Sequence, residues 1–355
     1  MSYSFLIHPD TYKKIELYRS KLANYGVNLA GEYFKHQLQG VAISSLDNEA
    51  FLERLVATKP PHIFAEMSVY GTGEDWNHTE LSILGDIGVA VPVQIYDNGK
   101  HRDPVVHDEP IAGTLLFSPG ALLRNDTNNE PIDWAEVTFD NQINVLAYQK
   151  LYERRLLPLL LHANQVAFDR GKKALITLPG LGCGQFAGQF VGTMGAYLKE
   201  ALVALLTKHA EVLSSVAAVY FDPYNECQNE RYQFNEVVLL VRPLTQCNQH
   251  RPQLCQPGVY GDEGDDFSEC LLFSIVAWDH VSWPGNDFYC GHRATDDGVK
   301  GAATNSMTIL TGIEGAYDPY SYTYEPPSNY RNWAEVVNKN NLRLKVQENL
   351  IVLPA

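Results

Sequence analysis

Three aspartates in one C-terminal segment are spaced so that they could act together on a substrate. Asp279, Asp287 and Asp297 lie within IVAWDHVSWPGNDFYCGHRATDDGVKGAATNSM, residues 275–307. Asp279 follows an apolar stretch typical of a strand, and Asp297 stands where a helix should begin. A carboxylate can stabilise developing positive charge, orient or deprotonate a water molecule, or pair with a guanidinium group. We therefore interpret the segment as a candidate catalytic site.

A second candidate site is a glycine-rich loop between a predicted strand and a predicted helix. It reads ALITLPGLGCGQFAGQF, residues 174–190. Backbone N–H groups at the start of a helix favour anions, and glycines let the chain turn sharply and approach a phosphate. The loop is neither a P-loop nor the dinucleotide fingerprint. It predicts a diphosphate-binding loop formed by Gly180, Gly182, Cys183, Gly184, Gln185, Phe186, Ala187 and Gly188.

Plainer interpretations stay open for both segments. The glycine loop could be a tight turn that packs only against other backbone. Asp297 could cap a helix, Asp287 could belong to a turn and Asp279 could cap a strand end. Asp296 and Asp297 together could bind magnesium, as an aspartate pair does in some hydrolases of a different, helical fold.

Cys183 offers a further alternative. At the N-terminus of a helix its pKa could be depressed, and His280 or His292 could then complete a nucleophile pair. No local protease signature surrounds this cysteine. The simpler interpretation is a small side chain that fits a cramped loop.

The surrounding elements should position these residues in an α/β fold. Predicted strands cover 63–70, 89–96, 113–118, 174–178, 215–221, 236–242 and 271–277. Predicted helices cover 11–24, 47–59, 141–169, 187–209 and 298–310, with Asp140 as a cap and Pro158 as a kink or break in the third of these. A strand, a helix and a strand in sequence over 174–221 predict a βαβ unit and hence a partly parallel sheet.

The overall composition limits the class of protein. The 355 residues carry a net charge of −15, without the basic clusters of a nucleic-acid-binding surface. No apolar run is long enough to span a membrane, and the N-terminus lacks the pattern of a secretory signal. Six cysteines without a CxxC pair favour reduced thiols. We therefore expect a cytoplasmic protein that binds neither nucleic acid nor membrane.

The glycine loop resembles the second ligand loop of macrodomains, which bind ADP-ribose. In that family the loop wraps the diphosphate through backbone amides. Upstream, LGDIG at 84–88 resembles the family's Gly-Asp-Ile element, which implies that Asp86, followed by Ile87, accepts a hydrogen bond from the adenine amine. The chain lacks the Asn-Ala-Ala-Asn first loop and the paired glutamates of other catalytic members. The stretch FSPGALLRNDTNNE, 117–130, could occupy the first-loop position.

The aspartate segment is similar to the signature of MavL-like macrodomain hydrolases, Legionella-type effectors that remove ADP-ribose from ubiquitin arginine. The resemblance implies that Asp279, Asp287 and Asp297 are catalytic and that Trp278 and Asn286 contact ADP-ribose. It covers most of residues 60–340. It implies a macrodomain-like mixed sheet flanked by helices over 61–355, preceded by an N-terminal helical extension over 1–60.

The resemblance also implies an activity: hydrolysis of the N-glycosidic bond between ADP-ribose and arginine. Ubiquitin is the expected protein substrate, free ADP-ribose is the product, and neither a cofactor nor a metal is expected. The site of action would be the host cytosol if the chain is a translocated effector. Two alternatives remain, a non-catalytic reader of ADP-ribose and a hydrolase of poly-ADP-ribose or ester linkages.

Overall fold

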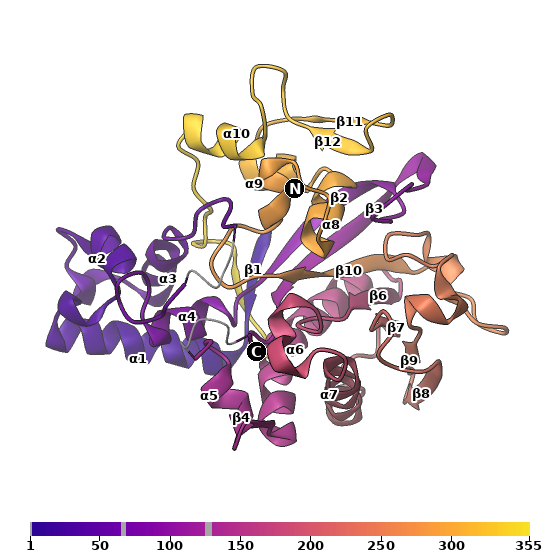
Figure 1. Ribbon diagram of the computed structural model, residues 1–355, viewed down its shortest axis with the longest axis horizontal. Helices are drawn as coiled ribbons and strands as arrows, with labels where there is room; N and C mark the ends of the chain where they lie inside the picture. The colour runs from indigo at the N-terminus through magenta and orange to yellow at the C-terminus, as the bar shows by residue number, and fades with distance from the viewer. Residues whose placement is uncertain (1, 65–68, 125–129) are drawn as a thin grey trace.

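A mixed β-sheet forms the centre of the molecule. The computed structural model describes residues 2–64, 69–124 and 130–355. Within them nine strands form one sheet (Figure 1). In spatial order these are β13 (Leu350–Val352), β1 (Ser4–Ile7), β2 (Gly88–Asp97), β3 (Val106–Pro119), β10 (Leu271–Trp278), β6 (Ala174–Pro179), β7 (Val216–Asp222), β9 (Val237–Val241) and β8 (Glu230–Phe234).

The central strands of this sheet run parallel to one another. β3, β10, β6, β7 and β9 pair in parallel, whereas β2 is antiparallel to β3 and β8 is antiparallel to β9. The register places Trp278 beside Pro119, and Pro179 beside Asp222. The carboxyl ends of β3, β10, β6 and β7 therefore meet at one edge of the sheet, where ligands bind in open α/β folds.

Side chains alternate between the two faces of the sheet and form two separate cores. On β10, Leu272 and Val276 belong to one core, while Phe273 and Ile275 belong to the other. This alternation is the period of a strand buried on both faces. The long helices α6 (Val145–Asp169) and α7 (Met194–His209) cover the face of Phe273 and Ile275.

The opposite face is covered by two groups of helices. Figure 1 shows α1–α4 gathered beside β1 and α8–α10 at the top of the view, near β2 and β10. Their bounds are α1 (Pro9–Tyr25), α2 (Glu32–Leu38), α3 (Asn48–Val56), α4 (His78–Leu84), α8 (Asp296–Ala302), α9 (Ser306–Thr311) and α10 (Trp333–Lys339). Outside these groups lie α5 (Trp134–Val137) and two small hairpins, β4 (Thr138–Phe139) with β5 (Gln142–Ile143), and β11 (Ala316–Asp318) with β12 (Thr323–Glu325).

The fold class predicted from the sequence, a mixed sheet flanked by helices, is confirmed. Six predicted strands correspond to β2, β3, β6, β7, β9 and β10, and β6, α7 and β7 form the predicted parallel βαβ unit. The seventh predicted strand, 63–70, lies partly outside the described residues. Of the described residues, no helix combines the length and apolar character needed to cross a membrane.

Several predicted boundaries are corrected. Residues 4–7, which we expected within a helical extension, form β1 and pair with both β2 and β13. Helix α6 begins after Asn144, whose side chain caps the helix by accepting a hydrogen bond from the N–H of Ala147. Asp140, the predicted cap, instead lies at positive φ in the β4–β5 turn. Pro158 lies inside α6 without ending it. The division of the chain at residue 60 stays a prediction.

Two predicted helices are each split. The segment 187–209 divides into a 3₁₀ helix, η4 (Gln185–Phe190), and α7, with Gly188 at φ 54° and Gly192 at φ 88° breaking the helical path. The segment 298–310 divides into α8 and α9 around residues 303–305. The first split creates a longer loop after β6 than the sequence predicted.

Candidate functional site

A cavity of about 450 Å³ opens at the edge where the carboxyl ends of the central strands meet. The loops after β3, β6 and β10 form its walls, so the parallel sheet brings together segments about 60 to 100 residues apart in the chain. The lining residues are Ile63, Phe64, Gly120, Leu122, Arg124, Gly180, Gly182, Gly184, Gln185, Phe186, Ala277, Trp278, Asp279, Asn286, Asp287, Thr295, Asp296 and Asp297. The glycine loop and all three predicted catalytic aspartates therefore face the same space.

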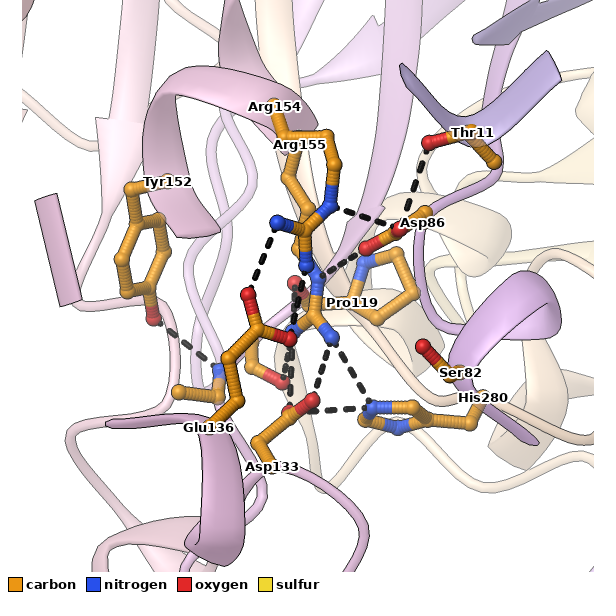
Figure 2. Close-up of polar contacts among 12 residues, drawn as sticks. Thr11, Ser82, Asp86, Pro119, Asp133, Glu136, Tyr152, Arg154, Arg155 and His280 are labelled. Carbon is orange, nitrogen blue, oxygen red and sulfur yellow. Dashed lines mark hydrogen bonds and ion pairs between the residues drawn. The ribbon is translucent and has the colours of Figure 1, made fainter. Parts of the chain in front are cut away.

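The loops after β3 and β6 approach each other so closely that only glycine fits at the contact. Gly182 has φ 73°, and a β-carbon there would lie 2.9 Å from the amide nitrogen of Ala121. The hydroxyl of Tyr152 on α6 joins the two loops, because it accepts from the N–H of Ala121 at 3.1 Å (Figure 2) and donates to the carbonyl of Leu181 at 2.8 Å. The positive φ and the crowding together explain the glycine.

The glycine loop carries unused backbone donors on residues that line the cavity. Among the described residues, no hydrogen bond uses the N–H groups of Gly182, Gly184, Gln185 or Phe186. Gln185 and Phe186 open η4, where the first N–H groups of a helix have no partner within the helix. These donors are suited to an anion such as a diphosphate.

Asp297 is the most strongly perturbed carboxyl of the cavity. It lies in the first turn of α8 and is 4% exposed. Burial raises the pKa of Asp297 to about 8; a hydrogen bond from Thr295 opposes this rise, and the neighbouring charges of Asp287 and Asp279 add to it. At neutral pH this carboxyl is therefore mostly protonated and able to donate a proton.

Asp287 lies on a short 3₁₀ helix, η7 (Asn286–Cys290), and is more open to solvent than Asp297. Its Oδ2 accepts from the hydroxyl of Thr295 at 2.7 Å. Thr295 is the N-cap of α8, and its hydroxyl also lies 2.6 Å from Oδ1 of Asp297. One hydroxyl therefore connects two predicted catalytic carboxyls.

Asp279 lines the cavity, but its oxygens are engaged by the turn that follows β10. Oδ1 accepts from the N–H groups of Val281 and Ser282, both at 2.7 Å, and Oδ2 accepts from the Ser282 hydroxyl. The capping role considered for this residue is therefore present. Lining and capping are compatible because each carboxylate oxygen has more than one lone pair.

Asp296 holds α8 against the sheet. Its Oδ2 accepts from the N–H of Ala277 at 2.7 Å and from the ammonium of Lys300 at 3.0 Å. The Asp296 carboxylate therefore takes part in an internal ion pair with Lys300. This differs from the magnesium-binding pair with Asp297 that we considered from the sequence. Within the described residues, no three His, Cys, Asp or Glu side chains are grouped to hold a metal ion.

Asn286 lines the cavity through a segment that its side chain fixes in place. Its Oδ1 accepts from the N–H of Ile63 at 2.7 Å, and its Nδ2 donates to the carbonyl of Ile63 at 3.1 Å. Its amide therefore holds Ile63 and Phe64 at the cavity wall, and the ADP-ribose contact implied for Asn286 stays a prediction. Trp278 also lines the cavity and is buried, and its implied contact with ADP-ribose likewise stays a prediction.

Asp86 and Ile87 do not line the cavity, which corrects the adenine contact implied for them. Ile87 is fully buried in the core. Asp86 accepts from Lys14 at 2.7 Å. It also accepts from Nε of Arg154 at 2.7 Å and pairs with Arg155 at 3.4 Å (Figure 2). Burial would raise the pKa of Asp86, but the two guanidinium groups and Lys14 outweigh it and lower that pKa. Its carboxylate is thus committed to a buried ion network.

The same ion network reaches the loop after β3. Arg155 pairs with Asp133 at 2.6 Å and donates to the carbonyl of Gly120 at 3.1 Å. His280 lies 3.2 Å from a carboxylate oxygen of Asp133 (Figure 2), and the same oxygen accepts from the N–H of Leu122 at 2.8 Å. Burial alone would raise the pKa of Asp133, but Arg155 and His280 hold it well below its usual range. This network fixes two cavity-lining residues.

Three other predicted loop residues face away from the cavity. Cys183 and Ala187 are buried in the core beneath the loop, and a β-carbon on Gly188 would lie 2.8 Å from the Cα of Arg124. Burial raises the pKa of the Cys183 thiol well above its usual value, contrary to a helix-activated thiolate. Since His280 is engaged by Asp133, it does not serve Cys183 as a base.

The sequence did not identify several lining residues. They are Ile63, Phe64, Gly120, Leu122, Arg124, Ala277 and Thr295. Gly120, Leu122 and Arg124 fall in the stretch 117–130 that we considered for the first-loop position; residues 125–129 of it lie outside the described residues. Thr295 could have been found as a helix cap, since a threonine two residues before Asp297 is a common N-terminal signal.

Comparison with known proteins gives one family. A family model described as macrodomain effector MavL matches residues 3–330. The match includes β1, helices α1–α4, the glycine loop and the aspartate segment. A search of curated proteins gives no match.

Proposed function

Because the chain belongs to the macrodomain effector MavL family, we propose that it hydrolyses the bond between ADP-ribose and an arginine of a modified protein. Family membership itself implies an activity related to ADP-ribose. The arginine linkage, ubiquitin as substrate and action in the host cytosol are parts of the proposal. One observation carries it: the glycine loop and Asp279, Asp287 and Asp297 line a single cavity.

The diphosphate of ADP-ribose fits the glycine loop. The chain has a net charge of −15, so its overall field opposes an anionic ligand. Local donors must overcome that field, and the N–H groups of Gly182, Gly184, Gln185 and Phe186 are available for this among the described residues. Fixed backbone donors require no reorganisation when the ligand binds.

The acidic residues of the cavity fit the arginine. The lining includes Asp279, Asp287, Asp296 and Asp297. A planar guanidinium donates well to carboxylates, often through two parallel hydrogen bonds. The cavity therefore offers backbone donors for an anion and carboxylates for a cation, as an ADP-ribosylated arginine requires.

The carboxyls can divide the reaction between acid and base roles. Cleavage of the bond between the anomeric carbon and the guanidinium nitrogen leaves positive charge on the sugar, which a charged Asp287 would stabilise. Protonated Asp297 would give its proton to the departing guanidine. Water then adds to the anomeric carbon and gives a proton to Asp287. The products are free ADP-ribose and an unmodified arginine.

The test uses ubiquitin that carries ADP-ribose on arginine. The wild-type protein should release free ADP-ribose, and Asp297→Ala should release almost none. Asp108→Ala serves as a control, because it removes an exposed aspartate from β3 without altering the cavity lining. Poly-ADP-ribose and ester-linked ADP-ribose, assayed in parallel, would identify another linkage as the preferred one.

A reader of ADP-ribose is the second candidate, and one observation favours it. Both oxygens of Asp279 are occupied by the turn at Val281 and Ser282, as in a purely structural cap. A reader would bind ADP-ribose tightly in the wild-type protein and in Asp297→Ala, with no release from any linkage. That result would replace the hydrolase assignment.

A further inference from the structure

The hydroxyl of Thr295 lies between the two carboxyls that we assign to acid and base roles. It is 2.7 Å from Oδ2 of Asp287 and 2.6 Å from Oδ1 of Asp297. It also accepts from the N–H of Gly298 at 3.4 Å, as the N-cap of α8. Both carboxyl distances are typical of strong hydrogen bonds.

Counting protons shows what these distances require. A hydroxyl has one hydrogen and two acceptor positions, so Thr295 cannot donate to two carboxylates at once. Every position is used if Asp297 keeps a proton and donates it to Thr295, while Thr295 donates to Asp287. The N–H of Gly298 then takes the second acceptor position. The greater burial of Asp297 identifies it as the carboxyl that keeps the proton.

We propose that Thr295 is a positioning residue that passes one proton between Asp287 and Asp297 in each catalytic cycle. The inference rests on the proposed hydrolysis. In that reaction Asp297 loses a proton to the guanidine and Asp287 gains one from water. Transfer from Asp287 to the hydroxyl of Thr295, and from that hydroxyl to Asp297, restores the starting state. No proton is gained or lost overall, and no further reactant is needed.

Other ionisable groups near Asp297 influence how the proton is shared between Asp297 and Asp287. Lys300 follows on the same helix, and its buried ammonium opposes the negative charge of the cluster. Asp296 begins this helix, and the other groups come from segments packed against it. Among the described residues, the groups that interact with Asp297 include Asp279, Asp287, Asp296, Tyr289 and Lys300. These residues are unchanged in every variant below.

Two substitutions separate proton transfer from helix capping. Thr295→Asn keeps a side-chain oxygen able to cap α8, but an amide cannot accept and release a proton in turn. We expect kcat to fall at least tenfold, with the dissociation constant for ADP-ribose changed by less than about twofold. Thr295→Ser keeps the hydroxyl and should retain most of the wild-type kcat. A merely structural role would not produce this split between kcat and binding.

A control variant tests whether the loss of a helix cap is by itself enough to lower kcat. Asp47→Ala removes the N-cap of α3, a helix of similar length outside the cavity lining. It should lower thermal stability while leaving kcat near wild type. If Thr295→Asn also keeps the wild-type kcat, the proton-transfer role is overturned.

A second measurement does not depend on activity. Carbon-13 NMR of protein labelled at the aspartate carboxyls gives a signal for Asp297, assigned by its loss in Asp297→Asn. Its titration midpoint should move in Thr295→Asn and Thr295→Val but stay in Thr295→Ser. An unmoved midpoint in both of the first two variants overturns the proton sharing. Failure of the wild-type protein to release ADP-ribose would overturn the proposed hydrolysis instead, whatever the NMR result.

Discussion

The main chains of Gly120 and Gly182 are in contact: a β-carbon added to Gly120 would lie 2.4 Å from the amide nitrogen of Gly182. These glycines follow β3 and β6, which are separated in the sheet by β10. Their contact closes the gap above β10, and both line the cavity. The wall against which we place the diphosphate is therefore mainly backbone.

Gly182→Ala tests this contact. The new methyl group would require an alanine at φ 73° and would collide with Ala121, so we expect a loss of about 2–4 kcal/mol in stability and weaker ADP-ribose binding. Gly171→Ala is the matched control, since Gly171 has φ 61° with open space around it. Thermal denaturation and calorimetric titration of both variants measure the effect. Equal losses of stability and binding in the two would contradict the contact.

Tyr152→Phe tests the link between the loops and α6. Removal of the hydroxyl leaves the N–H of Ala121 and the carbonyl of Leu181 without their partner, which should cost about 1–3 kcal/mol. ADP-ribose affinity should fall as well, because both loops border the cavity. Tyr148→Phe, one turn earlier, should cost less, since within the described residues the Tyr148 hydroxyl lies beside that of Tyr152 and bonds no backbone group. A larger loss for Tyr148→Phe would refute this assignment.

Asp297→Asn should stabilise the protein in a pH-dependent way. The pKa of Asp297 is about 8 in the folded state, against about 4 in an unfolded chain. Below pH 4 both states hold the proton, and from pH 4 to pH 8 only the folded state does, so wild-type stability falls as pH rises. The neutral asparagine removes this loss, by up to about 5 kcal/mol at pH 8. Melting temperatures at pH 4, 6 and 8 should show a widening gap.

The same variant should be inactive. Asparagine matches the shape of a protonated aspartate but cannot release a proton, so hydrolysis should fall by about 100-fold or more. A variant that is more stable yet inactive is the signature of a functional carboxyl buried at a cost to the fold. A stable variant with wild-type activity would exclude the acid role of Asp297.

Asp86→Asn separates a structural role from adenine recognition. The substitution leaves Lys14, Arg154 and Arg155 without a full counter-charge, which should cost about 3–5 kcal/mol. If Asp86 does not contact adenine, the affinity ratio between ADP-ribose and its hypoxanthine analogue should be the same as in wild type. A selective loss of the preference for adenine would restore the role implied by the family resemblance.

The sequence predicted the parts of the fold that have strong patterns. The apolar runs of β2, β6, β7, β9 and β10 are long enough to recognise, and a glycine loop after β6 followed from the βαβ unit. In contrast, β1 and β13 have four and three residues and owe their pairing to the sheet edge. Helix α4 was missed although Asn77 and Glu80 form a capping box that the sequence displays.

The site was predictable where residue types alone indicate chemistry. The glycines and aspartates could be identified in this way, because few other residue types allow a tight loop around a phosphate or supply a carboxylate. The anchoring residues could not, because Tyr152 and Arg155 on α6 look like an ordinary helix surface in the sequence. Only tertiary packing shows that both side chains point to loops from distant strands. Asp86 was misplaced for the same reason, since its cations come from α1 and α6.

Helix α6 holds the loop after β3 by two independent attachments, Tyr152 through Ala121 and Arg155 through Gly120. The attachments end on main-chain atoms, so they do not depend on which side chains the loop carries. Residues 122–124 could therefore diverge between related proteins, or be exchanged by design, while the path of the loop is preserved. Ligand preference in this architecture can change without a new scaffold.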